Sequence, residues 1–283
     1  MDANVLIISS FFIAILAGVI GSFLGLGGGF IIVPGLTLIL GVPIHLAIGA
    51  SFIGVLTNSS SASMVYLKQG LTNIRLGTLL EVGALTGAII GAAFALSLDS
   101  NTLSVIFGIA LLYGGLAMMR GRKTSPAADT AVSKRTSPVE APSSYVDHST
   151  NSTIYYVPHN IKPGIGLGVL GGLFAGLLGV GGGSVLVPIL NKVMGVPIKV
   201  AVATSSYVIG ITASAGALIF LSQGAIDVVI VVPIALGVFF GAQVGSRTAK
   251  YVRGEVLRKI FVIAVVYISI LMIANGLGFS ILF

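Results

Sequence analysis

The sequence predicts an all-α, polytopic integral membrane protein made of two inverted repeats, each with a glycine-broken helix hairpin and three further transmembrane helices. Three observations lead to this fold class. Of the 283 residues, 55% are hydrophobic and only 8% are charged, against about 25% charged residues in soluble proteins. The apolar residues gather in stretches of helix length. The second half of the chain also repeats motifs of the first at a constant offset.

The apolar stretches fall into two sets, separated by a polar segment. In the first half they cover residues 5–24, 29–41, 46–67, 74–98 and 102–119, and in the second half residues 163–178, 183–195, 200–221, 226–246 and 257–281. The first set is assigned to a repeat over residues 1–119 and the second to a repeat over residues 162–283. The stretch that begins at Val5 is too long for the apolar core of a signal peptide, so we expect it to remain as a membrane segment.

The segment between the repeats, residues 120–161, has a different composition. It is rich in Ser, Thr, Pro and Ala and carries scattered charges. Such a segment cannot bury enough apolar surface to fold by itself. We therefore expect a flexible, solvent-exposed linker on the cytoplasmic side.

The duplication is visible in an ungapped comparison of the two halves at an offset of 154 residues. Gly25, Gly27, Gly28, Gly29, Val33 and Pro34 recur as Gly179, Gly181, Gly182, Gly183, Val187 and Pro188. Gly83, Gly87 and Gly91 recur as Gly237, Gly241 and Gly245. The four-residue spacing of this last set is typical of small residues at which transmembrane helices pack closely.

The length of the first two stretches shows that the chain must break between them. A single helix from Val5 to Gly41, about 37 residues, would be about 55 Å long, whereas the hydrocarbon core is about 30 Å thick. The helix must break, and the triplet Gly27-Gly28-Gly29 is the expected place. If the two pieces form a hairpin, whether both cross fully or both are re-entrant, each repeat has an odd number of crossings and the repeats are inverted; if the pieces count as one span, the repeats are parallel.

The distribution of basic residues favours the inverted arrangement. It places the basic residues on the cytoplasmic side, as the positive-inside rule requires, and both termini outside. These residues are Lys68, Arg75, those of the linker, Lys192, Lys199 and the cluster from Arg247 to Lys259. A parallel arrangement would leave that last cluster outside.

Two glycine triplets are the predicted solute-binding elements: Gly27, Gly28 and Gly29, and Gly181, Gly182 and Gly183. The half-helices that begin at Phe30 and Ser184 offer backbone N–H groups and the positive end of a helix dipole, which suit an anion. Broken helices at equivalent positions of inverted repeats indicate the substrate site of a transporter. The alternative is close helix packing by small residues, but three consecutive glycines exceed what packing needs.

Polar side chains in two apolar stretches extend the predicted site. Ser51 and Asn58 lie in the stretch of residues 46–67, and Thr204 and Ser205 lie in its counterpart. Polar groups inside a bilayer need partners, so these side chains are expected to face protein or a wet path. Either they bind the solute, which we expect above all of Ser51 and Ser205, or they hydrogen-bond between helices and to their own helix.

Glu81 is the only acidic residue well inside an apolar stretch. A carboxylate within a membrane span is a functional candidate, here as the proton acceptor in coupled transport. The alternative is an ion pair with Arg75 near the start of the same helix. The counterpart of Glu81 in the second repeat is Ala235.

Gln69 and Gln223 each precede a glycine at the end of a polar stretch. A turn is the main interpretation of these two dipeptides. A contact at a gate of the transport path is the alternative.

Several classes of function are excluded by what the chain lacks. It has no cysteine and no GxxxxGK[ST] motif for ATP hydrolysis. An intramembrane hydrolase would need a base beside a serine such as Ser184, but His45, His148 and His159 are expected in loops or the linker. No enzyme activity, catalytic residue, metal site or cofactor is therefore predicted. No nucleic-acid partner is expected either, because the net charge of +7 flanks apolar stretches.

The doubled motif Gly25-Leu26-Gly27-Gly28-Gly29-Phe30-Ile31-Ile32-Val33-Pro34 and Gly179-Val180-Gly181-Gly182-Gly183-Ser184-Val185-Leu186-Val187-Pro188 resembles the signature of the sulfite exporter TauE/SafE family of membrane transporters. The segments Ala47–Ser51 and Ala201–Ser205 also resemble that family. The resemblance implies transport of sulfite, sulfonates or related small sulfur anions across a prokaryotic cytoplasmic membrane.

The sequence thus predicts a secondary transporter of a small anion that works by alternating access, with protons as the candidate coupling ion. An uncoupled anion channel or facilitator, and a membrane subunit of a larger complex, are the alternatives. The expected partners are the anion and the lipid bilayer, and assembly into a homo-oligomer is left open.

Overall fold

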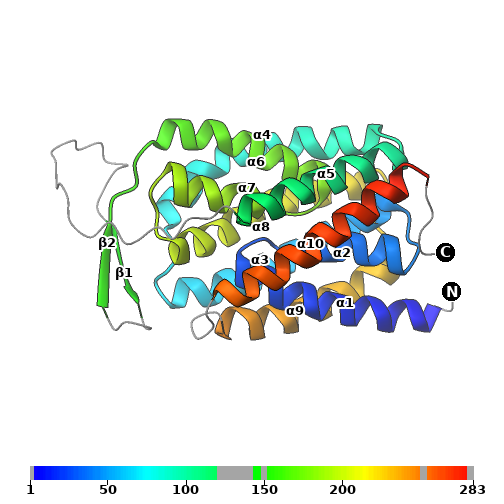
Figure 1. The fold of residues 1–283 in the computed structure, drawn as a ribbon, viewed down its shortest axis with the longest axis horizontal. Helices are drawn as coiled ribbons and strands as arrows, with labels where there is room; N and C mark the ends of the chain where they lie inside the picture. Colours follow the sequence, from blue (N-terminus) through cyan, green and yellow to red (C-terminus); the bar gives the residue numbers. More distant parts are fainter. Residues whose placement is uncertain (1–2, 120–142, 148–151, 249–253, 279–283) are drawn as a thin grey trace.

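The computed structural model describes residues 3–119, 143–147, 152–248 and 254–278, and most of these residues are helical (Figure 1). The helices of the first repeat are α1 (Ala3–Leu24), α2 (Gly29–Pro34), α3 (Ile44–Lys68), α4 (Ile74–Ser97) and α5 (Ser100–Met119). Those of the second repeat are α6 (Ile161–Leu178), α7 (Gly183–Pro188), α8 (Ile198–Ser222), α9 (Val228–Thr248) and α10 (Gly254–Gly276). The predicted all-α, polytopic fold class is confirmed.

Equivalent helices of the two repeats begin at the same offset. The helices α2, α3, α4 and α5 begin at residues 29, 44, 74 and 100, and α7, α8, α9 and α10 begin 154 residues later, at residues 183, 198, 228 and 254. The duplication of the sequence is therefore also a duplication of secondary structure.

Five of the described helices are long and apolar enough to cross a membrane: Asn4–Leu24, Ile74–Ser97, Ile161–Leu178, Ile198–Ser222 and Val228–Thr248. Two shorter apolar segments, Gly29–Ile39 and Gly183–Val193, are the half-helices. Each half-helix passes into a π-helical turn directly after its proline, Pro34 or Pro188. Proline has no N–H group to continue the regular hydrogen-bond pattern, which fits this change of helix type.

Helices from different repeats pack in parallel through glycine. On α9, the backbone at Gly237, Gly241 and Gly245 approaches that of Phe11, Ile15 and Val19 on α1. On α4, Gly83, Gly87 and Gly91 approach Ile165, Val169 and Leu173 on α6 in the same way. Both series advance by four residues on each helix, so the two helices of each pair run in the same direction. The four-residue glycine spacing therefore serves close helix packing.

Equivalent helices of the two repeats pack antiparallel. Between α3 and α8, Phe52 contacts Gly216, Ser59 contacts Gly210 and Tyr66 packs with Ala203, so the numbers fall on one helix as they rise on the other. Between α5 and α10, Gly108 contacts Ser269, and Gly276 contacts Asn101. Opposite directions of equivalent helices are the relation that inverted repeats need.

These contacts divide the core into two bundles that mix the repeats (Figure 1). We call α1, α3 and α9 the first bundle, because α3 also packs in parallel on α9, with Gly54 against Ile234 and Val238. We call α4, α6 and α8 the second bundle, because Gly77 of α4 packs against Tyr207 of α8. The bundles meet along the antiparallel pair α3 and α8, and α5 and α10 lie across them.

The segment expected to be an unstructured linker contains a β-hairpin. Strands β1 (Ser143–Asp147) and β2 (Ser152–Tyr156) pair antiparallel, with Tyr145 opposite Ile154. Asn73, which caps the N-terminus of α4, donates from Nδ2 to Tyr156 Oη over 3.1 Å. Burial raises the pKa of the Tyr156 phenol, and its hydrogen bonds with Asn73 and Ser143 oppose that shift. The expectation of a linker without regular structure is therefore wrong for these strands, while residues 120–142 and 148–151 lie outside the described residues.

Charged residues are divided between the two ends of the molecule. The hairpin lies at one end, whereas the start of α1 and the end of α10 lie at the other (Figure 1). Six basic residues lie at or near helix ends on the hairpin side, Lys68, Arg75, Lys162, Lys192, Lys199 and Arg247, and Arg258 and Lys259 lie in the first turns of α10. Asp99 and Asp227 precede α5 and α9 at the opposite end.

Candidate solute site at the crossing of two glycine loops

The helix breaks of the two repeats have the same shape. We call residues 25–29 the first glycine loop and residues 179–183 the second glycine loop. Gly27 and Gly28 have φ angles of +85° and +87°, and Gly181 and Gly182 have φ angles of +82° and +70°. Residues with a Cβ rarely adopt such angles. These four glycines are therefore needed for the turn that reverses the chain between a long helix and its half-helix.

The two loops cross each other in the centre of the protein. A Cβ at Gly29 would meet the carbonyl oxygen of Gly179 and lie 2.8 Å from Cα of Val180. A Cβ at Gly183 would lie 2.7 Å from Cα of Leu26. Gly29 and Gly183 do not have positive φ angles, so it is the close approach of the other loop that requires glycine here.

Each loop is held by a serine of the other repeat. Ser51 Oγ of α3 donates to the carbonyl oxygen of Gly179 over 2.7 Å. Ser205 Oγ of α8 lies 3.1 Å from the carbonyl oxygen of Gly25 and 3.0 Å from that of Val202, so its single proton is shared. Both serine side chains are fully buried. The structure thus brings these two predicted site residues to the glycine loops, where their protons bind backbone oxygens.

The N–H groups of the two glycine triplets, unlike the carbonyl oxygens of Gly25 and Gly179, form no hydrogen bonds in the described structure. Within the described part of the chain, the N–H groups of residues 27–29 and 181–183 donate no hydrogen bond to a backbone or side-chain oxygen. All of these glycines are buried, and buried N–H groups normally have a partner. The crossing therefore presents buried N–H groups without a partner among the described residues, which suits a ligand that accepts hydrogen bonds.

Asn58 of α3 lies beside the first glycine loop. A Cβ at Gly21 would lie 2.6 Å from both Asn58 Nδ2 and Cα of Gly28, so the amide and the loop approach the same point. The Asn58 side chain is 2% exposed, and its Oδ1 has no hydrogen-bond partner among the described residues. Thr204 is placed differently, because its Oγ1 accepts a hydrogen bond from the backbone N–H of Asn73 over 3.1 Å. It joins α8 to the start of α4.

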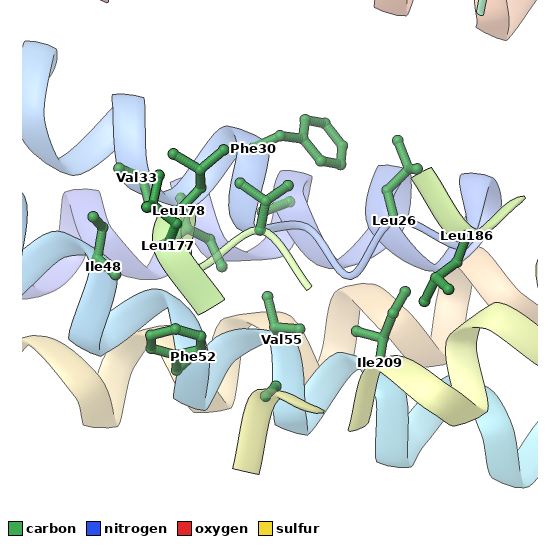
Figure 2. Close-up of a cluster of buried hydrophobic side chains, with 14 of the residues drawn as sticks. Leu26, Phe30, Val33, Ile48, Phe52, Val55, Leu177, Leu178, Leu186 and Ile209 are labelled. Atoms are coloured by element: carbon green, nitrogen blue, oxygen red, sulfur yellow. The ribbon is translucent and has the colours of Figure 1, made fainter. Parts of the chain in front are cut away.

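Apolar side chains close the crossing, and sequence reasoning missed their role. Val55 of α3 and Ile209 of α8, which are equivalent in the two repeats, both contact Gly27 and Gly181 (Figure 2). Both side chains are fully buried. Val55 and Ile209 are 154 residues apart, and this offset could have indicated a shared role. However, one apolar residue in an apolar helix cannot be distinguished from its neighbours by sequence. Together with the burial of both loops, this pair gives the site a closed conformation.

Glu81 is buried, with 8% of its surface exposed, and neither carboxylate oxygen has a hydrogen-bond partner in the part of the chain that the structure describes. It lies one helical turn after Gly77, so its side chain is on the side of α4 that contacts α8. It is not among the groups that approach or hydrogen-bond the glycine loops in the described residues.

Gln69 and Gln223 lie at the ends of α3 and α8, at opposite ends of the molecule. Each is followed by a glycine with a positive φ angle, +67° at Gly70 and +69° at Gly224. Gln69 is half-buried and Gln223 is exposed. Their positions are those of residues in helix-terminating turns.

Comparisons with known proteins identify a family and several relatives of this chain. The family model described as "Sulfite exporter TauE/SafE" matches residues 10–272. The chain is 27% identical to the probable membrane transporter protein YunE of Bacillus subtilis, over 94% of this chain and 96% of YunE. It is also 27% identical to the probable membrane transporter protein MJ0441 of Methanocaldococcus jannaschii, over 87% of each chain. No solved structure matches the chain.

Proposed function

The chain belongs to the sulfite exporter TauE/SafE family, and on that premise we propose that this multi-pass membrane transporter carries a small anion by alternating access. The proposed solutes are sulfite, a related sulfur oxyanion or a small sulfonate. The proposed site is the crossing of the loops, where the N–H groups of Gly27, Gly28 and Gly29 and of Gly181, Gly182 and Gly183 are the candidate donors.

One observation carries the preference for an anion. At the crossing of the loops, the carbonyl oxygens of Gly25 and Gly179 accept hydrogen bonds from Ser205 and Ser51, whereas the N–H groups of the triplets are unengaged in the described structure. The unengaged N–H groups offer hydrogen-bond donors to a ligand at the positive end of a half-helix, which favours an anion over a cation. The role proposed for Ser51 and Ser205 is therefore to orient the loops.

The charge distribution supports a location in the cytoplasmic membrane with the hairpin end inside. Basic side chains, among them Lys68, Arg75, Lys192 and Lys199, lie on the hairpin side, and the opposite end carries Asp99 and Asp227. Cytoplasmic loops carry the excess of Lys and Arg in bilayer-spanning proteins.

The chain has no cysteine, so this orientation can be tested with single substitutions. Ser144→Cys on β1 and Ser100→Cys at the start of α5 both lie at exposed positions. An impermeant thiol reagent applied to intact cells is expected to label the variant at residue 100 and to spare the variant at residue 144. Labelling of the variant at residue 144 from outside would reverse the orientation.

The proposed movement is a rotation of the two mixed bundles against each other. Rocking of one repeat against the other would have to separate the parallel pairs α1–α9 and α4–α6, which are joined backbone to backbone at glycine. The contact between the bundles runs instead along α3 and α8 and through the glycine loops. Ala62→Cys together with Ala203→Cys would place a thiol pair across that contact. We expect oxidation of this pair to stop transport and reduction to restore it; unchanged transport with a complete cross-link would refute the movement.

Glu81 is the proposed proton acceptor, because it is a buried carboxylate without a hydrogen-bond partner on the side of α4 that faces α8. In this position its protonation can change the packing of the second bundle. Glu81→Gln keeps the shape of the side chain and removes its charge.

The function is tested by flux into proteoliposomes that contain the purified chain. Labelled sulfite, sulfate, thiosulfate and a small sulfonate would be compared with and without a pH gradient, with protein-free liposomes as the control. We expect flux of a sulfur anion that responds to the gradient in the wild type and no longer responds in Glu81→Gln. Flux that ignores the gradient would identify an uncoupled facilitator. No flux of any of these anions through folded protein would refute the proposed solute class.

A further inference from the structure

Resting on the proposed function, we infer that the anion binds at the first glycine loop only, that Asn58 is the residue that selects it, and that the solute is a singly protonated oxyanion. The inference comes from the places where the two repeats differ around otherwise matching loops.

The side chains that face the two loops are not equivalent. The counterpart of Asn58 in the second repeat is Thr212. Thr212 Oγ1 bonds back to its own helix, 3.0 Å from the carbonyl oxygen of Ile209. Its hydroxyl group is thereby satisfied, and threonine is too short to match the reach of an asparagine amide. Asn58 is as deeply buried, but its Oδ1 has no partner.

A second difference gives Asn58 its room. The amide of Asn58 lies against Gly21 of α1, where a Cβ would come within 2.6 Å of Nδ2. The counterpart of Gly21 is Ala175, whose methyl group already fills this place and would lie 2.9 Å from a Cβ at Gly182. The first repeat therefore has a glycine and a long polar side chain where the second has a methyl group and a short one.

The chemistry of this corner specifies the solute further. The Nδ2 group of Asn58 and the N–H groups of the first glycine loop are donors, and they fit the oxygens of an anion. The Oδ1 atom can only accept, so a satisfied complex needs a ligand that also brings a donor. A singly protonated oxyanion such as hydrogensulfite has both kinds of group, whereas sulfate near neutral pH has acceptors alone. By this argument the second loop is a structural element.

The test compares Asn58→Leu, which keeps the volume and removes both polar atoms, with Thr212→Val, which makes the matching change in the second repeat. Uptake of sulfite and of sulfate would be measured in proteoliposomes at mildly acidic pH. Folding would be checked by size exclusion, and binding would be read independently from the thermal stabilisation that sulfite gives. We expect Asn58→Leu to lower sulfite uptake and apparent affinity about 10- to 100-fold, the loss of hydrogen bonds to a charged ligand. Thr212→Val is expected to stay within about twofold of the wild type, since its hydroxyl group bonds only within its own helix.

A second pair of variants tests the same corner without touching Asn58. Gly21→Ala would press a methyl group against both the Asn58 amide and the backbone of Gly28 and should reproduce the loss, and Ala175→Gly should not. The inference is overturned if Asn58→Leu stays within about twofold of the wild type, if Thr212→Val loses as much, or if the wild type moves sulfate as well as sulfite. In each of these outcomes the wild type still transports an anion, which separates them from a failure of the proposed function, in which the wild type transports none.

Discussion

Ser51 and Ser205 occupy equivalent positions, yet their replacement by alanine should have unequal effects. Ser51 gives its proton to one acceptor, the carbonyl oxygen of Gly179, at 2.7 Å. Ser51→Ala would leave that buried oxygen without this partner, at a cost of about 1–3 kcal/mol. Ser205 shares its proton with the carbonyl oxygen of Val202 on its own helix, so Ser205→Ala gives up a weaker bond and should cost about 0.5–1 kcal/mol.

The assay heats the purified variants in the same detergent and measures, at each temperature, the fraction that still elutes as folded protein. For a chain of this size about 1 kcal/mol corresponds to a few degrees. We therefore expect the apparent melting temperature to fall by about 3–9 °C for Ser51→Ala and by about 1–3 °C for Ser205→Ala. Ser60→Ala is the matched control, because the exposed Ser60 bonds only to Leu56 of its own helix. A Ser51→Ala protein as stable as the Ser60→Ala control would refute the argument that this serine holds the opposite loop.

Three further predictions concern the loops, the hairpin and a helix start. Gly29→Ala should destabilise by about 1–3 kcal/mol through crowding. Gly70 has a φ of +67°, and no described atom lies within 4 Å of the position of a Cβ there. Gly70→Ala should therefore cost only the backbone strain of about 1–2 kcal/mol. Equally small losses of thermal stability in Gly29→Ala and Gly70→Ala would argue against the contact between the loops. Because burial raises the pKa of Tyr156, the hairpin should stay docked below about pH 10 and loosen above it. Limited proteolysis of the hairpin should therefore become faster as the pH rises above this value. Tyr156→Phe should remove this increase, and an unchanged increase in the variant would contradict the prediction. The backbone N–H of Thr102 holds the pKa of Asp99 below its usual range. The Asp99 carboxylate therefore stabilises the start of α5 at a pH above its unfolded-state pKa, and this stabilisation is lost as the pH falls. Asp99→Asn should make hydrogen exchange at the start of α5 less dependent on acid pH, and an unchanged dependence would contradict this role.

Much of the fold could be predicted because its signals are local. The apolar stretches predict the helices, and the glycine triplets predict the breaks, since only glycine fits the turn at Gly28 and Gly182. The offset of 154 residues predicts the matching boundaries of the two repeats. These features depend on neighbouring residues, which sequence patterns report directly.

The arrangement of the site could not be predicted, because it depends on residues far apart in the chain. Nothing near Ser51 indicates that its partner is Gly179, and nothing near Gly29 indicates that the second loop packs against it. The sequence therefore suggested that Ser51 binds solute, whereas its proton is engaged by the backbone. The mixing of the repeats in two bundles has the same cause: glycines at four-residue spacing predict a close partner helix without specifying which one.

The β-hairpin was missed for a different reason. Composition averaged over residues 120–161 is polar, and that average hides the short runs around Tyr145 and Tyr155, in which aromatic and β-branched residues favour strands. The docking of Tyr156 on Asn73 adds a tertiary contact that no strand propensity contains.

The reciprocal bonds of Ser51 and Ser205 also bear on how the protein is made. A ribosome completes the first repeat well before it reaches residue 205, so the carbonyl group of Gly25 enters the bilayer ahead of the hydroxyl group that will bind it. Neither half can mature alone, and we expect the halves, expressed as two separate chains, to accumulate only when they are produced together.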